Sequence, residues 1–130
     1  MVTDVEKFKA VQTLLMHRLI TKEDLNAMRV NRVFGEDKST EPSGVVRVKL
    51  FCGSSTWLLS EFDEKNGLFF GLCDLGHGCP ELGYVGPEQL ASLVYDRGKG
   101  LVLERDKFFE PTQNLEEYAT KSREQGFISV

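Results

Sequence analysis

Residues 56–74 read TWLLSEFDEKNGLFFGLCD, and this stretch decides the fold. Two runs rich in aromatic and aliphatic residues, 56–63 and 68–74, flank the tetrapeptide 64–67, which ends in Asn-Gly. Asn-Gly between two apolar runs is the strongest short-range hairpin signal, because both residues tolerate the positive φ of a tight turn. The stretch therefore predicts two antiparallel strands at the centre of the chain.

Outward from this hairpin, the patterns predict strands before it and after it, and helices around them. Strands are expected at 45–51, 81–85 and 101–105, the first because apolar residues alternate with basic ones. Helices are expected at 3–17, 22–31, 87–95 and 114–125, from capping residues and apolar spacing. The polar segment 35–44 is expected to be a loop. This order predicts an α+β domain with an antiparallel meander of about five strands and flanking helices.

Composition narrows the function classes. The chain has 130 residues, 41% of them hydrophobic, and a net charge of -4, which suits one globular domain. Residues 1–50 hold nine basic and seven acidic side chains and the remainder seven and thirteen, which argues against binding duplex nucleic acid. The absence of a long apolar run argues against a membrane span. Three cysteines, an odd number, and a mixed-charge N-terminus lead us to expect a cytoplasmic protein.

A series of short motifs gives the chain a family resemblance. In order they are Leu19-Ile20-Thr21-Lys22-Glu23, Val48-Lys49-Leu50-Phe51 before Thr56-Trp57, Glu61-Phe62-Asp63, Leu68-Phe69-Phe70-Gly71, Glu81-Leu82-Gly83-Tyr84, and Glu104-Arg105-Asp106 with Phe108 to Thr112. Together they resemble the small bacterial proteins grouped as domain of unknown function 2958, over roughly three-quarters of the chain. The resemblance implies an accessory role on plasmids, conjugative elements or phages, and it brings no catalytic residues. Residues 1–18 are expected to be a helical extension of a single domain at 19–130.

Cysteine and histidine residues suggest one possible metal site. Cys73, His77 and Cys79 are close in sequence, and Cys52 lies on a strand that could be near. Zinc knuckles, however, use two closely spaced ligand pairs, which this spacing lacks. We expect Cys52 and Cys73 to be small core residues and His77 to lie in a turn, with no metal and no cofactor bound.

Paired acidic residues suggest an enzyme as an alternative. Glu61 and Asp63, and likewise Glu104 and Asp106, alternate along expected strands, and a small hydrolase or nuclease would need such acids to converge. Glu61 is expected on the same strand face as Trp57 and Leu59, partly buried. A structural salt bridge between Glu61 and Arg105 is the favoured interpretation over catalysis.

Aromatic residues on neighbouring strands suggest a second alternative. Trp57, Phe69, Phe70 and Tyr84 could form a stacking platform for single-stranded nucleic acid, although aromatic residues in strands usually belong to the core. The favoured hypothesis is a non-enzymatic protein that binds a protein partner, with a host-defence component as one candidate. The residues expected to contact that partner are Trp57, Glu61, Tyr84, Arg105 and Asp106.

The first helix raises the question of oligomeric state. Val5, Phe8, Val11 and Leu15 share one face, and a helix this short must dock its apolar stripe somewhere. We expect the stripe to pack on the domain and the protein to be a monomer, with a homodimer through this helix as the alternative. The change Phe8→Asp is accordingly expected to lower the melting temperature.

Overall fold

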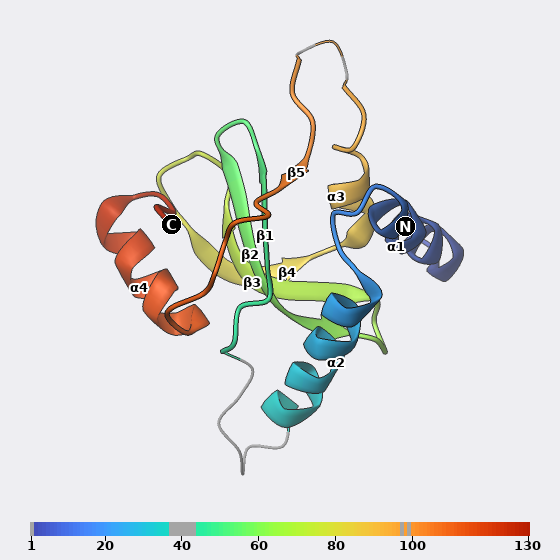
Figure 1. Ribbon diagram of the computed structural model, residues 1–130, viewed down its shortest axis with the longest axis horizontal. Helices are drawn as coiled ribbons and strands as arrows, with labels where there is room; N and C mark the ends of the chain where they lie inside the picture. Colours follow the sequence, from blue (N-terminus) through green and yellow to red (C-terminus); the bar gives the residue numbers. More distant parts are fainter. Residues whose placement is uncertain (1, 37–43, 97, 99) are drawn as a thin grey trace.

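The computed structural model describes residues 2–36, 44–96, 98 and 100–130 (Figure 1). Along this part of the chain the elements are α1 (Asp4–Met16), α2 (Lys22–Glu36), β1 (Val48–Cys52), β2 (Ser55–Asp63), β3 (Leu68–Asp74), β4 (Glu81–Val85), α3 (Pro87–Ala91), β5 (Glu104–Arg105) and α4 (Leu115–Gln125). The strands form one antiparallel sheet in the order β4-β3-β2-β1-β5. The predicted α+β meander is confirmed.

The β2–β3 hairpin forms at the predicted Asn-Gly turn. Asp63 pairs with Leu68 across the hairpin, and Gly67 adopts a φ of 67°, in the left-handed region that favours glycine. The Gly67 N–H donates to the Asp63 carbonyl at 2.7 Å. The Asp63 carboxylate accepts from the backbone N–H and the side-chain amide of Asn66. The turn is therefore fixed by its own polar residues.

A bulge in β2 changes which face of the sheet its later residues occupy. The pairing of β2 with β3 shifts between Leu59 and Glu61, leaving Ser60 as the extra residue. One extra residue moves every following side chain to the other face, because side chains alternate along a strand. Glu61, paired with Phe70, therefore lies opposite Leu59 and Trp57. The expectation that Glu61 shares their face is wrong.

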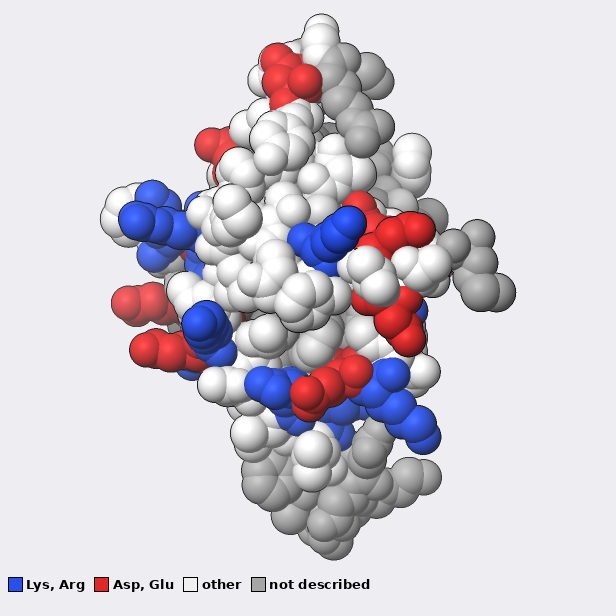
Figure 2. Space-filling view, turned by 90° about the vertical axis from the view of Figure 1, so that its right-hand side faces the viewer, with Lys and Arg blue, Asp and Glu red and all other residues white. Residues whose placement is uncertain are grey.

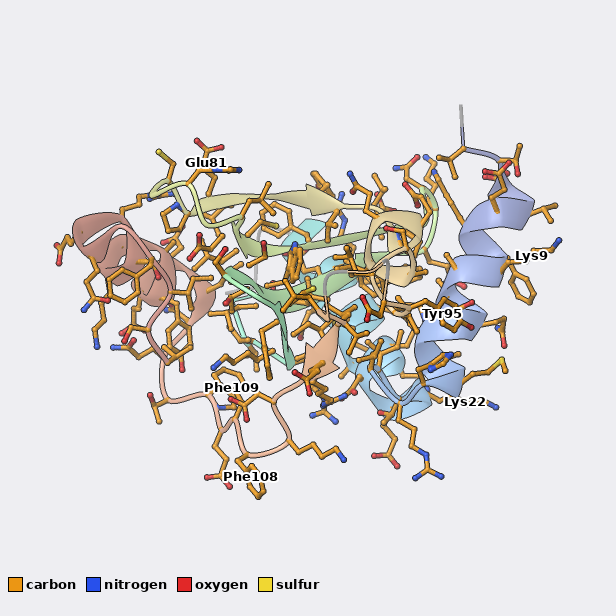
Figure 3. The ribbon with its side chains drawn as sticks, turned by 90° about the horizontal axis from the view of Figure 1, so that it is seen from above. Lys9, Lys22, Glu81, Tyr95, Phe108 and Phe109 are labelled. Atoms are coloured by element: carbon orange, nitrogen blue, oxygen red, sulfur yellow. The ribbon has the colours of Figure 1, made fainter. Side chains whose placement is uncertain are left out.

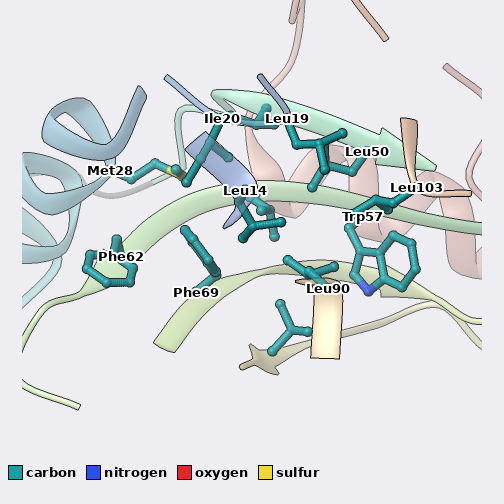
Figure 4. Close-up of a cluster of buried hydrophobic side chains, with 13 residues drawn as sticks. Leu14, Leu19, Ile20, Met28, Leu50, Trp57, Phe62, Phe69, Leu90 and Leu103 are labelled. Atoms are coloured by element: carbon teal, nitrogen blue, oxygen red, sulfur yellow. The ribbon is translucent and has the colours of Figure 1, made fainter. Parts of the chain in front are cut away.

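Each face of the sheet carries its own apolar cluster. On one face, α1, α2 and α3 contribute Leu14, Met28 and Leu90 to the larger cluster, which Figure 4 shows together with Trp57 and Phe69. On the other face, α4 forms the second cluster. Its buried members are Val46, Leu58, Leu72, Leu115, Tyr118 and Ala119. The helices thus cover both faces of the sheet.

The first helix docks on the rest of the chain as expected, but only half of the predicted stripe takes part. Its buried residues are Ala10 and Leu14, whereas Phe8 is 64% exposed and Val5 is 62% exposed. Val11 and Leu15 are half-buried against the larger cluster. The docked face is set by Leu14 in the core and by Lys7, whose ammonium donates to the Asn66 carbonyl at 2.8 Å. Since Phe8 adds little to the core, Phe8→Asp is expected to leave the melting temperature nearly unchanged and not to lower it as the stripe predicts.

Several other boundaries differ from prediction, and the strand expected at 45–51 begins only at Val48. Helix α2 continues to Glu36, past its expected end at Asn31, whose side-chain amide donates to the Val45 and Ser60 carbonyls. Helix α3 ends at Ala91, and β5 is only two residues long. The N–H of Leu103 donates to the carbonyl of Leu93 instead of to β1, which shortens the expected strand. Most of the expected loop 35–44 lies outside the described residues.

No helix in the described part of the chain is long and apolar enough to cross a membrane. The side of the molecule that carries α1 and α2 shows acidic and basic side chains interspersed among uncharged ones (Figure 2). On this face the described basic residues do not form the continuous stripe that duplex nucleic acid would need.

Candidate binding surface

The loop between β5 and α4 displays an aromatic side chain to solvent. Phe108 is 94% exposed, whereas its neighbour Phe109 is half-buried and packs on Tyr118 with ring centroids 6.2 Å apart. In Figure 3, Phe108 points away from the body of the molecule. Burying a phenylalanine is worth about 2 kcal/mol, so the fold forgoes this stabilisation at Phe108. An exposed aromatic of this kind is a candidate contact residue.

Phe108 is held in place by Asp106. The Phe108 N–H donates to one carboxylate oxygen of Asp106 at 3.0 Å, and the Lys49 ammonium donates to the other at 3.1 Å. Lys49 also donates to the carbonyl of Val130, and the Asp106 N–H donates to the Lys49 carbonyl. The bond from Lys49 is the main cause of a lowered pKa at Asp106. The loop is therefore anchored to β1, which limits the entropy that binding would cost.

Open hollows lie on both sides of Phe108. One is lined in part by Lys49, Phe51, Thr56 and Lys107, and the other by Glu110 and residues of α4 and the C-terminal segment. We define the Phe108 surface by these residues: Lys49, Phe51, Thr56, Asp106, Lys107, Phe108 and Glu110. An aromatic knob between two hollows, with charged groups at the rim, has the anatomy of a protein contact site.

Arg105 is a structural residue next to this surface. Its guanidinium donates to the Leu19 carbonyl at 3.3 Å and to the carboxylate of Asp24. Asp24 also accepts from Arg47 Nε at 3.0 Å and from the Thr21 N–H, while the Thr21 hydroxyl caps α2 by accepting from the Asp24 N–H. The predicted contact residue Arg105 thus ties β5 to the start of α2, and the predicted pair with Glu61 is wrong.

Glu61 and Tyr84 meet at a cluster that the sequence did not indicate. Arg32 of α2 donates to the Tyr84 hydroxyl at 2.7 Å and to Glu61 at 3.4 Å, and it lies 3.6 Å from Asp63. These contacts, the Tyr84 bond foremost, raise the pKa of Arg32. At Asp63, burial alone would raise the pKa, but hydrogen bonds from Asn66 and the charge of Arg32 lower it. No sequence pattern marks Arg32, because the contact depends on how α2 crosses the sheet.

The remaining candidates do not form a common site. Trp57 is only 5% exposed and belongs to the core, as does Phe69, so the predicted aromatic platform is not assembled. Phe70 and Tyr84 form an edge-on pair on the opposite face, with centroids 5.0 Å apart. Of the acids proposed for catalysis, Glu61 pairs with Arg32, Asp106 pairs with Lys49, and Glu104 is exposed. Glu61 lies on β2, whereas Glu104 and Asp106 lie at β5, on the far side of β1 in the strand order.

The cysteines have different surroundings. Cys52 and Cys73 pack against the larger apolar cluster, and burial raises the pKa of the Cys73 thiol to about 11. Cys79 is exposed. Among the residues that the structure describes, no group of three or more His, Cys, Asp and Glu side chains is placed to hold a metal ion. Gly76 and Gly78, which flank His77, both have positive φ, as expected of a turn.

Comparison with known proteins assigns the chain to a family. Residues 19–129 match the family model described as Protein of unknown function (DUF2958), which includes the whole sheet and the Phe108 surface. Helix α1 lies before the matched segment. No curated protein and no solved structure gives a significant match. The resemblance inferred from the motifs is confirmed, and the chain belongs to the DUF2958 family.

Proposed function

We propose that this protein is not an enzyme and acts by binding another protein through the Phe108 surface. The observation that carries the proposal is Phe108 itself, 94% exposed on a loop that Asp106 and Lys49 hold in place. Anchored aromatic residues that fill a partner's pocket supply much of the energy of protein association. Of the predicted contact residues, Asp106 belongs to this surface and Arg105 supports it from behind.

The arrangement of the acidic residues supports binding over catalysis. General acid–base or metal-assisted hydrolysis requires acids that converge on one site. Glu61 and Asp106 instead belong to separate ion pairs, with Arg32 and with Lys49. Both pairs have evident structural roles. The first joins α2 to β2, and the second joins the Phe108 loop to β1.

The setting that we propose is a bacterial mobile element or phage, with the protein acting in the cytoplasm as an accessory factor. This part rests on the family resemblance, since the motif Glu104 to Thr112 includes the Phe108 loop. A host-defence protein is our candidate for the partner. The odd number of cysteines, three, suits a reducing compartment.

Comparative capture from a nuclease-treated bacterial host lysate tests the proposal. The wild-type protein is expected to retain a specific protein, and Phe108→Asp is expected to lose it. The matched control is Phe8→Asp, the same change at an exposed phenylalanine on α1, which should still capture the partner. Both variants should melt close to the wild type, because neither side chain is buried.

Two outcomes would contradict the proposal in different ways. Equal capture by wild type and Phe108→Asp would show that the partner binds elsewhere. Capture from a parallel untreated lysate that is lost in the nuclease-treated one would identify a nucleic acid as the ligand. The site for single-stranded nucleic acid would then consist of Lys49 and Lys107 together with Phe51 and Phe108.

A further inference from the structure

The sheet has one edge that nothing covers in the described part of the chain. Strand β4 ends the strand order, and Figure 3 shows it along one margin of the sheet with no described element beyond it. Outside the sheet itself, none of the backbone hydrogen bonds between described residues involves 81–85. Unpaired backbone groups along an edge strand are a ready template for another strand.

The composition of β4 does little to block such pairing. Natural edge strands are protected by charges, prolines or bulges. Here the one charged residue is Glu81 at the start, and the strand continues as Leu82-Gly83-Tyr84-Val85 with a regular register to β3. Tyr84 is 50% exposed. Prolines stand only outside the strand, at 80 and 87, where they limit its length and not its pairing.

We infer that β4 pairs antiparallel with β4 of a second copy of this chain, about a twofold axis at Gly83. Every second residue of β4 directs its backbone N–H and C=O groups away from β3. In an antiparallel ladder these residues of the two copies must lie opposite one another, so the residue numbers of any two paired positions sum to an even value. The register with the sum 166 is the one that pairs all five residues. It sets Leu82 opposite the partner's Tyr84, Glu81 opposite the partner's Val85, and Gly83 opposite itself.

This register is favourable in its side chains as well as in its backbone. The pair of Leu82 with the partner's Tyr84 occurs twice in the dimer, once on each side of the axis. Aliphatic–aromatic cross-strand pairs of this kind stabilise sheets. The only charged residue of the strand faces an apolar one, so like charges are not opposed. The interface is small, which predicts a weak dimer with a dissociation constant of about 10–100 µM.

The inference does not depend on the proposed function. The Phe108 loop follows β5, at the other end of the strand order from β4, and Figure 3 places the two on opposite margins. Pairing through β4 would join two five-stranded sheets into one and leave both Phe108 surfaces free. Self-association and partner capture can therefore succeed or fail independently.

Gly83 allows a sharp test, because a Cβ added there would meet no atom within 4 Å. Side chains introduced at this position would face their own copies across the twofold axis. Gly83→Lys alone and Gly83→Glu alone should each raise the dimer dissociation constant about tenfold, through like charges directly opposed. An equal mixture of the two should restore association as a heterodimer. Gly83→Ala is the matched control and should associate like the wild type.

Sedimentation velocity from about 10 to about 500 µM, a range that brackets the expected affinity, gives the readout. The wild type should shift with concentration from 14.7 kDa toward twice that mass. Amide exchange should slow with concentration in residues 81–85, a measurement that requires no variant. A constant monomer mass in the wild type would overturn the inference. So would a dimer indifferent to Gly83→Lys, or a Lys/Glu mixture that stays monomeric.

Discussion

Asp24 offers the most direct test of how the structure joins its parts. Its carboxylate is 3% exposed and accepts from Arg47 Nε at 3.0 Å, from Arg105, and from the Thr21 N–H at 3.0 Å. It thereby connects the start of α2 to β1 and β5. The change Asp24→Asn keeps the shape of the side chain but removes the charge and leaves an amide N–H₂ facing cationic donors. We expect it to destabilise the fold without changing its architecture.

The magnitude follows from burial. Removing one partner of a buried ion pair typically costs about 3–5 kcal/mol. The side chain of Arg47 is 43% exposed and that of Arg105 is 22% exposed, so both can regain some hydration. We therefore expect a loss of about 2–3 kcal/mol in the free energy of unfolding. For a chain of this length that corresponds to a melting temperature lower by about 7–11 °C.

The effect should also depend on pH in a defined direction. Burial alone would raise the pKa of Asp24, but the hydrogen bonds from Arg105 and Thr21 outweigh it, and the net pKa is lowered. A carboxyl whose folded pKa lies below its unfolded value stabilises the protein above that unfolded value, about 3.9. The difference between wild type and Asp24→Asn should be complete at pH 6 and shrink as pH falls below about 4.

Urea unfolding at pH 6 and at pH 3 measures both effects. The control is Glu64→Gln, which removes the exposed partner of the Arg29–Glu64 pair, 3.3 Å apart. That change should cost less than about 0.5 kcal/mol, as surface pairs do. If Asp24→Asn and Glu64→Gln proved equally mild at pH 6, the account of Asp24 as a connecting residue would be refuted.

Three further predictions concern packing and reactivity. A Cβ at Gly71 would lie 2.0 Å from a carbonyl oxygen of β2, so Gly71→Ala should cost about 3 kcal/mol in urea unfolding, whereas Gly83→Ala should change stability by less than about 1 kcal/mol. Phe8→Asp should shift the melting temperature in calorimetry by less than about 2 °C, since the side chain is already exposed. Iodoacetamide at pH 8 should label Cys79 well before Cys73, whose raised pKa keeps it protonated, as mass spectrometry would show.

Much of the fold follows from local signals in the sequence. The Asn-Gly turn gives the central hairpin, and the final helix begins at Asn114 and stops at Gly126, as its caps predict. Asn114 accepts from the Glu117 N–H while Glu117 accepts in return from Asn114, and Gly126 takes a left-handed φ of 85°. Such features depend on a few neighbouring residues, which is why the sequence alone predicts them.

What the sequence did not predict depends on contacts between distant segments. The bulge at Ser60 reverses the face of Glu61, and nothing in the residues around it marks an extra position. The face of α1 that packs on the domain depends on its contacts with the larger apolar cluster, so Leu14 is buried in the core and Phe8 is not. Phe108 and Phe109 are identical in type, and only the packing of Phe109 on Tyr118 decides which of them remains exposed.

Dimerisation through β4 should raise the avidity of binding through the Phe108 surface. A dimer joined at β4 would carry two Phe108 surfaces on its outer margins, facing away from each other. A partner displayed at high density on a matrix would then be held by two contacts, and linked contacts can exceed the single affinity by about 10²–10⁴ where both are engaged at once. Gly83→Lys should weaken capture of such a partner while leaving its affinity for a single site unchanged. Phe108→Asp should abolish both the capture and the single-site binding. Binding measured at low and at high density of the partner therefore separates the contribution of the Phe108 surface from that of the β4 edge.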